Sequence, residues 1–174
     1  MADTIPCGNI PIMGDLEALR VLLDSSWAKA GNGARSSWGQ TDRMTAEQVV
    51  SFLADQRYCA IATTGPQGEP HLVPVSFLSL ADGTFWLPTV DGSVRLRDVL
   101  SNSRAAVVVG QGVAGTHAAV MARGPVLAVA SAEVPAAVLE RAQAKLGDTA
   151  WAAWWLLLRP DRLLAYSRSS SHPE

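Results

Sequence analysis

The feature that most constrains the fold is a succession of short apolar runs separated by tight-turn sequences. Tyr58–Thr64 is followed by GPQG at 65–68, and Pro70–Leu80 is followed by Asp82-Gly83. Apolar and β-branched runs bounded by Gly, Pro and Asp predict strands that pair as antiparallel hairpins. A third strand is expected at Thr84–Thr89, directly after the second turn.

Similar runs continue to the end of the chain, with helical segments between them. Further strands are expected at Arg104–Gly110, Ala118–Ala130, Trp151–Leu158 and Arg162–Ser167, with a Gly-rich loop at Gln111–Thr116. Helices are expected at Asp15–Ala30, from Thr45, at Ser93–Asn102 and at Ser131–Gly147. Chains rich in hairpins often close their sheet into a barrel, because closure removes exposed strand edges. We therefore predict a mainly β, antiparallel barrel with peripheral α-helices.

Two prolines restrict how the expected strands can pair. Pro74 and Pro88 each lie inside a strand-like run. Proline has no backbone N–H to give to a strand ladder, so each is expected at a sheet edge, at a bulge, or facing away from a ladder bond.

The length of 174 residues suits one domain with flanking segments. We expect an N-terminal extension with one helix at 1–43, a barrel domain at 44–167, and a polar tail at 168–174. Within the extension, the Gly- and Ser-rich stretch Gly31–Asp42 is expected to be a connection.

Composition excludes several classes of function. The net charge is −2, so the chain has no basic excess of the kind that nucleic-acid binding needs. The longest apolar run, Ala150–Leu158, is too short for a membrane helix. Met1–Gly14 has no signal-peptide pattern, and Cys7 and Cys59 are expected to be free thiols. We therefore expect a soluble, cytoplasmic protein that binds neither nucleic acid nor membrane.

The stretch VDGSVRLRDVLSN at 90–102 places two cations at a helix start, where Arg95 and Arg97 follow the capping residue Ser93. The N-terminal end of a helix dipole is positive, so arginines there are unfavourable unless an anion is present. Free backbone N–H groups and guanidinium groups both suit a phosphate. Two interpretations stay open: the arginines bind a phosphate, or they are solvated or paired with Asp91 and Asp98.

The order of these elements resembles the pyridoxamine 5′-phosphate oxidase-like family, also called FMN-binding split barrels. The segments that carry the resemblance are GPQGEPHLVPV (65–75), DGTFWLPT (82–89), GSVRLRDVLSN (92–102) and RAAVVV (104–109), followed less specifically by MARGPV (121–126) and LRPDRLLAY (158–166). The resemblance covers residues 44 to 166 and implies a six-stranded antiparallel split β-barrel. It also implies a homodimer, with the cofactor in the groove between two barrels and the partner subunit contributing to the site.

The same resemblance implies a set of cofactor-binding residues. The helix after the third strand would hold the cofactor phosphate, and the second strand would lie along the isoalloxazine ring, partly through its backbone. The implied phosphate ligands are Thr89, Ser93, Arg95 and Arg97, and the implied ring-lining residues are Val73, Pro74 and Val75. Trp86 on the third strand is expected to face either the ring or the core.

The chain departs from true pyridoxamine phosphate oxidases at the positions that grip their substrate. Val94 stands where they carry a basic residue after the serine, and Val73 and Leu78 replace basic residues of the second strand. The ending LLAYSRS (163–169) lacks their Arg-x-His motif. Oxidation of pyridoxamine phosphate is therefore not expected, and the chain is more similar to the broader group that uses FMN or a deazaflavin coenzyme in other reductions.

Four functions remain open at this point. The first is an FMN-dependent oxidoreductase acting on a small molecule, and the second is a deazaflavin-dependent reductase on the same fold. The third is a non-catalytic haem- or flavin-binding protein with His71 as a haem ligand, although the sequence favours a surface histidine on an edge strand at this position. The fourth is a barrel whose only role is dimerisation. No side chain is an obvious acid or base, which agrees with chemistry carried by a cofactor, and no His and Cys spacing indicates a metal site.

Overall fold

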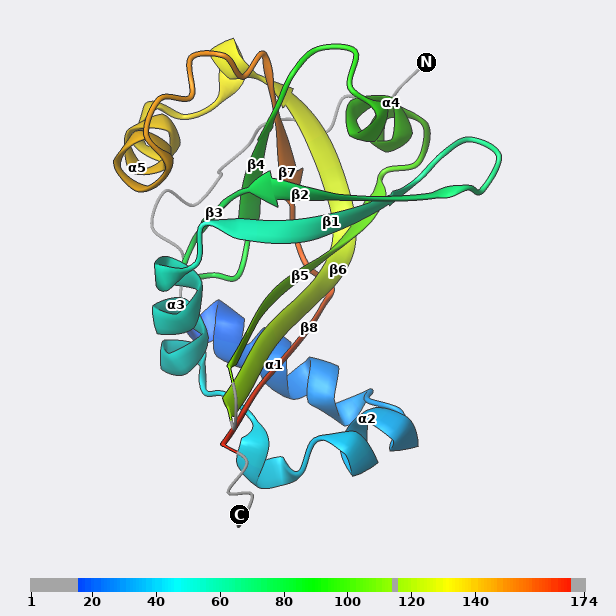
Figure 1. The fold of residues 1–174 in the computed structure, drawn as a ribbon, viewed down its shortest axis with the longest axis vertical. Helices are drawn as coiled ribbons and strands as arrows, with labels where there is room; N and C mark the ends of the chain where they lie inside the picture. The colour runs from blue at the N-terminus through cyan, green and yellow to red at the C-terminus, as the bar shows by residue number, and fades with distance from the viewer. Residues whose placement is uncertain (1–15, 114–115, 170–174) are drawn as a thin grey trace.

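The computed structural model describes residues 16–113 and 116–169 and has eight strands and five α-helices there (Figure 1). The strands are β1 (Tyr58–Thr64), β2 (Pro70–Ser76), β3 (Leu78–Ser79), β4 (Phe85–Thr89), β5 (Arg104–Val113), β6 (Thr116–Ala130), β7 (Trp154–Leu158) and β8 (Arg162–Ser169). The helices are α1 (Leu16–Ala28), α2 (Asn32–Ser37), α3 (Ala46–Asp55), α4 (Val94–Ser101) and α5 (Ala136–Leu146), with 3-10 turns at Gln40–Asp42 and Ser131–Glu133.

A single curled antiparallel sheet runs in the order β2-β1-β5-β6-β7-β4-β3, and β8 also pairs with β6. The long strand β6 joins the two halves of the sheet. Its first part pairs with β5 and β8, and its last part, from Val126, pairs with β7. This arrangement is a split barrel, so the expected mainly β fold with peripheral helices is confirmed.

The described residues form eight strands, against seven strand-like runs in the sequence and six strands implied by the resemblance, because the run Pro70–Leu80 is not one strand. The run breaks at Phe77, whose side chain is fully buried. Before the break β2 pairs with β1, and after it β3 pairs with β4. The two pieces therefore belong to different halves of the barrel, which an apolar run alone does not reveal.

Two other expectations are corrected. The expected loop Gln111–Thr116 is largely part of a hairpin, since β5 continues to Val113 and β6 begins at Thr116. The expected connection Gly31–Asp42 contains α2 and a 3-10 turn. The extension thus holds a second helix beyond α1. Residues 168 and 169 of the expected polar tail belong to β8, and residues 170–174 lie outside the described residues. The boundary expected at residue 44 stays a prediction.

The two prolines occupy positions that need no N–H donor on one side. Pro74 lies on β2, the strand at one end of the sheet order. Pro88 pairs with Trp155 of β7, while β3 on the other side of β4 reaches only Phe85 and Trp86. Both prolines are therefore at local edges, as the missing donor requires.

The apolar side chains form two buried clusters. The larger one fills the barrel and includes Leu19 and Leu23 of α1, so the N-terminal extension contributes to the barrel core. The smaller one lies between α5 and the β3-β4-β7 part of the sheet, and it contains Trp86 and Trp155. Trp86 therefore faces a core, one of the two orientations expected for it.

The helix expected from Thr45 is present as α3, and local side chains cap its first turn. The Thr45 hydroxyl accepts from the backbone N–H of Gln48, and the Gln48 side chain accepts from the Thr45 N–H, which completes a capping box at the start of α3. Among the residues described, no helix is long and apolar enough to cross a membrane.

Candidate functional site

The turn between β4 and α4 prepares the start of the arginine-bearing helix. Gly92 has a φ of 66°, a left-handed conformation that favours glycine. The Ser93 hydroxyl then accepts from the backbone N–H of Leu96 at 3.3 Å, as expected for a cap. The same hydroxyl lies 2.9 Å from that of Thr89, whose side chain is fully buried. Two of the expected phosphate ligands are thus held together at one end of α4.

The two arginines of α4 differ in their surroundings. Arg95 is half-buried, and burial lowers the pKa of its guanidinium from the ordinary value. Its Nε is buried and has no hydrogen-bond partner among the described residues. Arg97 is exposed. An orphaned guanidinium nitrogen beside a helix N-terminus is an arrangement that an anion would complete.

Neither arginine is neutralised within the described chain. No carboxylate of residues 16–113 or 116–169 lies within ion-pairing distance of Arg95 or Arg97. Asp91 instead accepts from the indole N–H of Trp154 at 3.2 Å, and Asp98 is bonded elsewhere. Pairing of the arginines with Asp91 and Asp98 is therefore not what the structure contains, whereas the other part of that interpretation, a solvated side chain, stays open for the exposed Arg97.

Asp98 belongs to a buried network that the sequence did not reveal. Its Oδ2 accepts from the Thr63 hydroxyl at 2.6 Å and lies 2.8 Å from Nδ1 of His71. The Asp98 side chain is 3% exposed, whereas that of His71 is 36% exposed. The alternation of side chains along the strands could have indicated part of this network. Thr63 lies on the same inward face of β1 as Cys59 and Ile61, and His71 shares a face of β2 with Val73.

The three ring-lining residues implied for β2 do not share one face. Val73 and Val75 point to the same side as His71, and Val75 is buried in the barrel core. Pro74 points to the opposite side and is exposed. Because β2 is the end strand, its outward backbone groups stay unpaired in the ladder, and they are the part of β2 best placed to contact a ligand.

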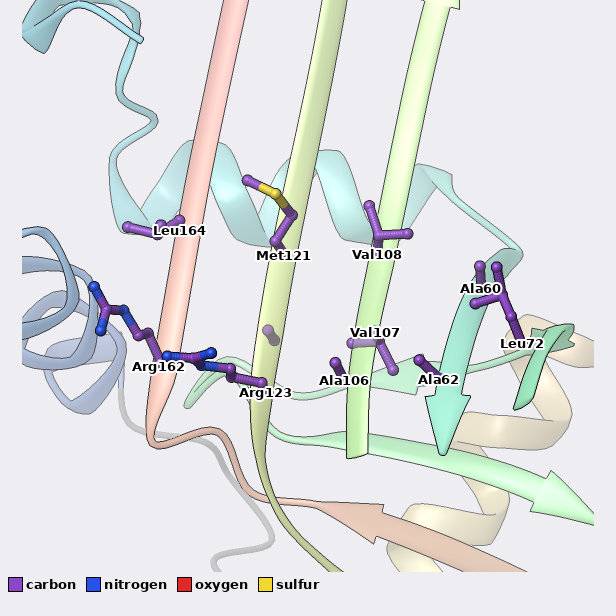
Figure 2. A pocket seen from close by; sticks show the side chains of 11 residues that line it. Ala60, Ala62, Leu72, Ala106, Val107, Val108, Met121, Arg123, Arg162 and Leu164 are labelled. Carbon is purple, nitrogen blue, oxygen red and sulfur yellow. The ribbon is translucent and has the colours of Figure 1, made fainter. Parts of the chain in front are cut away.

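The outer face of the sheet carries a second feature, an apolar hollow of about 440 Å³ (Figure 2). Its floor consists of small and apolar side chains that include Ala60, Ala106 and Val108. Arg123 and Arg162, which face each other across β6 and β8, lie at one end of it. Leu72, at its margin, is 68% exposed. A contiguous apolar surface of this kind, unlike a single exposed apolar side chain, is typical of an interaction surface.

The strand order and the helices that flank the sheet define a split β-barrel. The family model for pyridoxamine 5′-phosphate oxidase matches residues 45–169, and the chain therefore belongs to the pyridoxamine 5′-phosphate oxidase-like family. This confirms the resemblance drawn from the element order and extends its end from residue 166 to residue 169.

Among solved structures, two neighbours illustrate the shared fold. The FAD-binding protein from Mycobacterium smegmatis superposes with a TM-score of 0.58 and 19% identity, covering 74% of this chain and 98% of its own. HutZ, the haem storage protein from Vibrio cholerae, has a TM-score of 0.59 and 14% identity, covering 69% of this chain and 93% of its own. At these identities both show the shared fold and nothing more.

One curated relative is an enzyme. The chain is 39% identical over 66 residues to the 5a,11a-dehydrotetracycline/5a,11a-dehydrooxytetracycline reductase of Streptomyces rimosus. The match covers 36% of this chain and 46% of the reductase, so the chain spans less than half the length of that relative.

Proposed function

We propose that this chain is a flavin-dependent oxidoreductase that binds FMN at the start of α4 and reduces a small molecule. The observation that carries the proposal is the buried, unpartnered Nε of Arg95. It lies on the same helix start as the paired hydroxyls of Thr89 and Ser93. A phosphate there would accept from the guanidinium, the hydroxyls and the free backbone N–H groups together.

The phosphate and the ring of the cofactor would bind to two different parts of the chain. Arg95, Arg97, Ser93 and Thr89 would hold the phosphate, and the edge strand β2 would support the ring. The flavin would supply the hydride transfer, and the protein would bind, orient and shield it. The reductase relative from Streptomyces rimosus supports a reduction as the reaction type.

A deazaflavin coenzyme is the second candidate on the same site. Its support is the exposed second arginine, Arg97, which is free of acidic partners among the described residues and would suit a longer phosphate-bearing tail. The hydrophobic Val94 takes the place of a basic residue at the helix start and argues for a variant clamp rather than that of the oxidases.

We further propose that the chain forms a homodimer through the apolar hollow of β1, β5, β6 and β8. The exposed side chains of Leu72 and Val108 and the small residues between them give an apolar surface without a partner in the described chain. A second copy would cover it, and the groove between two such barrels would complete the cofactor site. A cytoplasmic location remains our prediction for the assembly.

The decisive experiment is titration of the purified protein with FMN, the deazaflavin coenzyme and haemin, followed by visible absorbance and fluorescence. We expect FMN to bind, and Arg95→Ala combined with Arg97→Ala to weaken binding by a few kcal/mol, or about two orders of magnitude in Kd. Arg141→Ala, an exposed arginine on α5, is the matched control and should bind as the wild type does.

Three outcomes would contradict this proposal in different ways. Unchanged FMN affinity in the double variant would contradict the assignment of Arg95 and Arg97 as phosphate ligands. Binding of the deazaflavin but not FMN would favour the second candidate. A haem absorbance band that His71→Ala abolishes, without flavin binding, would place the chain among haem-binding barrels.

A further inference from the structure

We propose that His71 is an additional ligand-binding residue of the cofactor site, and that Asp98 positions it. Its Nε2 would accept a hydrogen bond from a hydroxyl of the polyhydroxylated chain that links the cofactor phosphate to its ring. This assignment rests on the proposed flavin or deazaflavin function, because both cofactors carry such a chain.

The first step is the direction of the His71–Asp98 hydrogen bond. A carboxylate only accepts, and Asp98 Oδ2 already accepts from the Thr63 hydroxyl at 2.6 Å. Nδ1 of His71, at 2.8 Å from the same oxygen, must therefore be the donor. In a neutral imidazole the other nitrogen, Nε2, is then an acceptor.

The second step is the position of the imidazole relative to the two surfaces of the proposed site. His71 lies on β2, two residues before Val73 and on the same face. Its partner Asp98 lies on α4, three residues after Arg95, and residues three apart are neighbours on a helix surface. In Figure 1, α4 lies beside the β1–β2 hairpin, so His71 stands where the phosphate-binding helix meets the ring-binding strand.

The third step is exposure. Asp98 and Thr63 are buried, at 2% and 4% exposure, and their side-chain oxygens are already joined by a hydrogen bond inside the network. The His71 side chain is 36% exposed, so its second nitrogen can be reached from outside the network. Within the network, Asp98 and Thr63 are therefore buried, and Nε2 of His71 is the polar atom that a ligand can reach.

The chemistry of Asp98 also indicates that it orients the His71 ring and does not only join α4 to β1 and β2. Burying a carboxylate is costly, and a neutral group of similar shape would tie α4 to β1 and β2 at lower cost. A carboxylate has one property that a neutral amide lacks, which is that it fixes the imidazole with its proton on Nδ1. The same arrangement of carboxylate and histidine orients metal-binding histidines, where the carboxylate sets the tautomer.

The tautomer can be measured directly by ¹⁵N NMR of the His71 ring in the ligand-free protein. We expect Nδ1 to be protonated and Nε2 to be unprotonated. In Asp98→Asn, whose amide can donate to Nδ1, the proton should move to Nε2. A wild-type ring protonated at Nε2 would overturn the assignment of Nε2 as an acceptor.

The contact itself is tested by comparing FMN with an analogue whose phosphate-bearing chain lacks hydroxyl groups. His71→Ala should weaken FMN binding about tenfold, the effect of one neutral hydrogen bond. It should leave the affinity for the analogue unchanged. His117→Ala, in which the removed histidine lies on β6, is the matched control and should bind both ligands as the wild type does.

Two conservative variants distinguish a direct contact between His71 and the ligand from a purely structural role of the His71–Asp98 hydrogen bond. His71→Gln keeps a polar atom near the Nε2 position and should recover part of the FMN affinity, whereas His71→Asn keeps one near Nδ1 and should not. Recovery by His71→Asn alone, or equal loss for FMN and the analogue, would overturn the ligand contact while leaving the phosphate clamp intact. A wild-type protein that binds neither FMN nor deazaflavin would overturn both proposals.

Discussion

The hydroxyl groups of Thr89 and Ser93 lie 2.9 Å apart across the turn that joins β4 to α4. This contact connects the end of a fully buried strand to the first capping bond of the helix. The contact therefore stabilises the connection between β4 and α4 and is also part of the proposed phosphate site. Experiments can distinguish its effect on stability from its effect on ligand binding.

Ser93→Ala should lower the free energy of unfolding by about 1 kcal/mol even without cofactor, because the cap to Leu96 is lost. Chemical denaturation of the ligand-free protein measures this. Ser101→Ala, at the other end of the same helix and exposed, should change stability by less than about 0.5 kcal/mol. Equal effects of the two variants would contradict the role of Ser93 as the cap.

Gly124→Ala should destabilise the protein by about 1–3 kcal/mol through overpacking. A Cβ atom at Gly124 would lie 2.4 Å from the Arg159 carbonyl oxygen and 2.7 Å from the Asp161 nitrogen, both of which are backbone atoms. Gly33→Ala provides the comparison, since a Cβ there meets nothing within 4 Å. The melting temperature of the first variant should fall, and that of the second should stay the same or rise.

Lys145 should make stability increase with pH just above neutrality. Burial lowers the pKa of its ammonium from 10.5 to about 8, although the group donates to the Leu53 carbonyl and lies over the Phe77 ring. Above pH 8 the unfolded chain therefore keeps a proton that the folded protein loses, and stability rises with pH.

The useful range for this test ends near pH 9. Burial raises the pKa of the Cys59 thiol from 9.0 to about 12, so above pH 9 the unfolded state gains stability by losing that proton. Between pH 7.5 and 9 the wild type should gain melting temperature relative to Lys145→Met. Identical pH profiles for the two proteins would rule out the lowered pKa of Lys145.

Leu72→Asp should convert the proposed dimer into a monomer, because it places a charge on an apolar surface that the partner would bury. Sedimentation velocity at a concentration where the wild type is dimeric measures this. Val21→Asp on α1, at 60% exposure against 68% for Leu72, is the control and should remain dimeric. A wild type that stays monomeric at high concentration would contradict the dimer itself.

Local sequence determined most of the secondary structure. The turns at 65–68 and at Asp82-Gly83 defined two hairpins, and Ser93 and Thr45 marked two helix starts, all of which are present. These features depend on neighbouring residues, whose capping and turn preferences act over a few positions. The break at Phe77 was missed because the run remains apolar on both sides, and only the choice of partner strand separates β2 from β3.

The same distinction between local sequence and tertiary contacts applies to the candidate site. The sequence by itself determined that two arginines stand at a helix start behind a capping serine, because that is a matter of spacing along one segment. Only the tertiary structure decided that Arg95 has a buried, unpartnered nitrogen and that Asp98 joins Thr63 and His71. Those contacts join residues up to 35 positions apart, and burial depends on how α4 packs against β1 and β6, which no local pattern encodes.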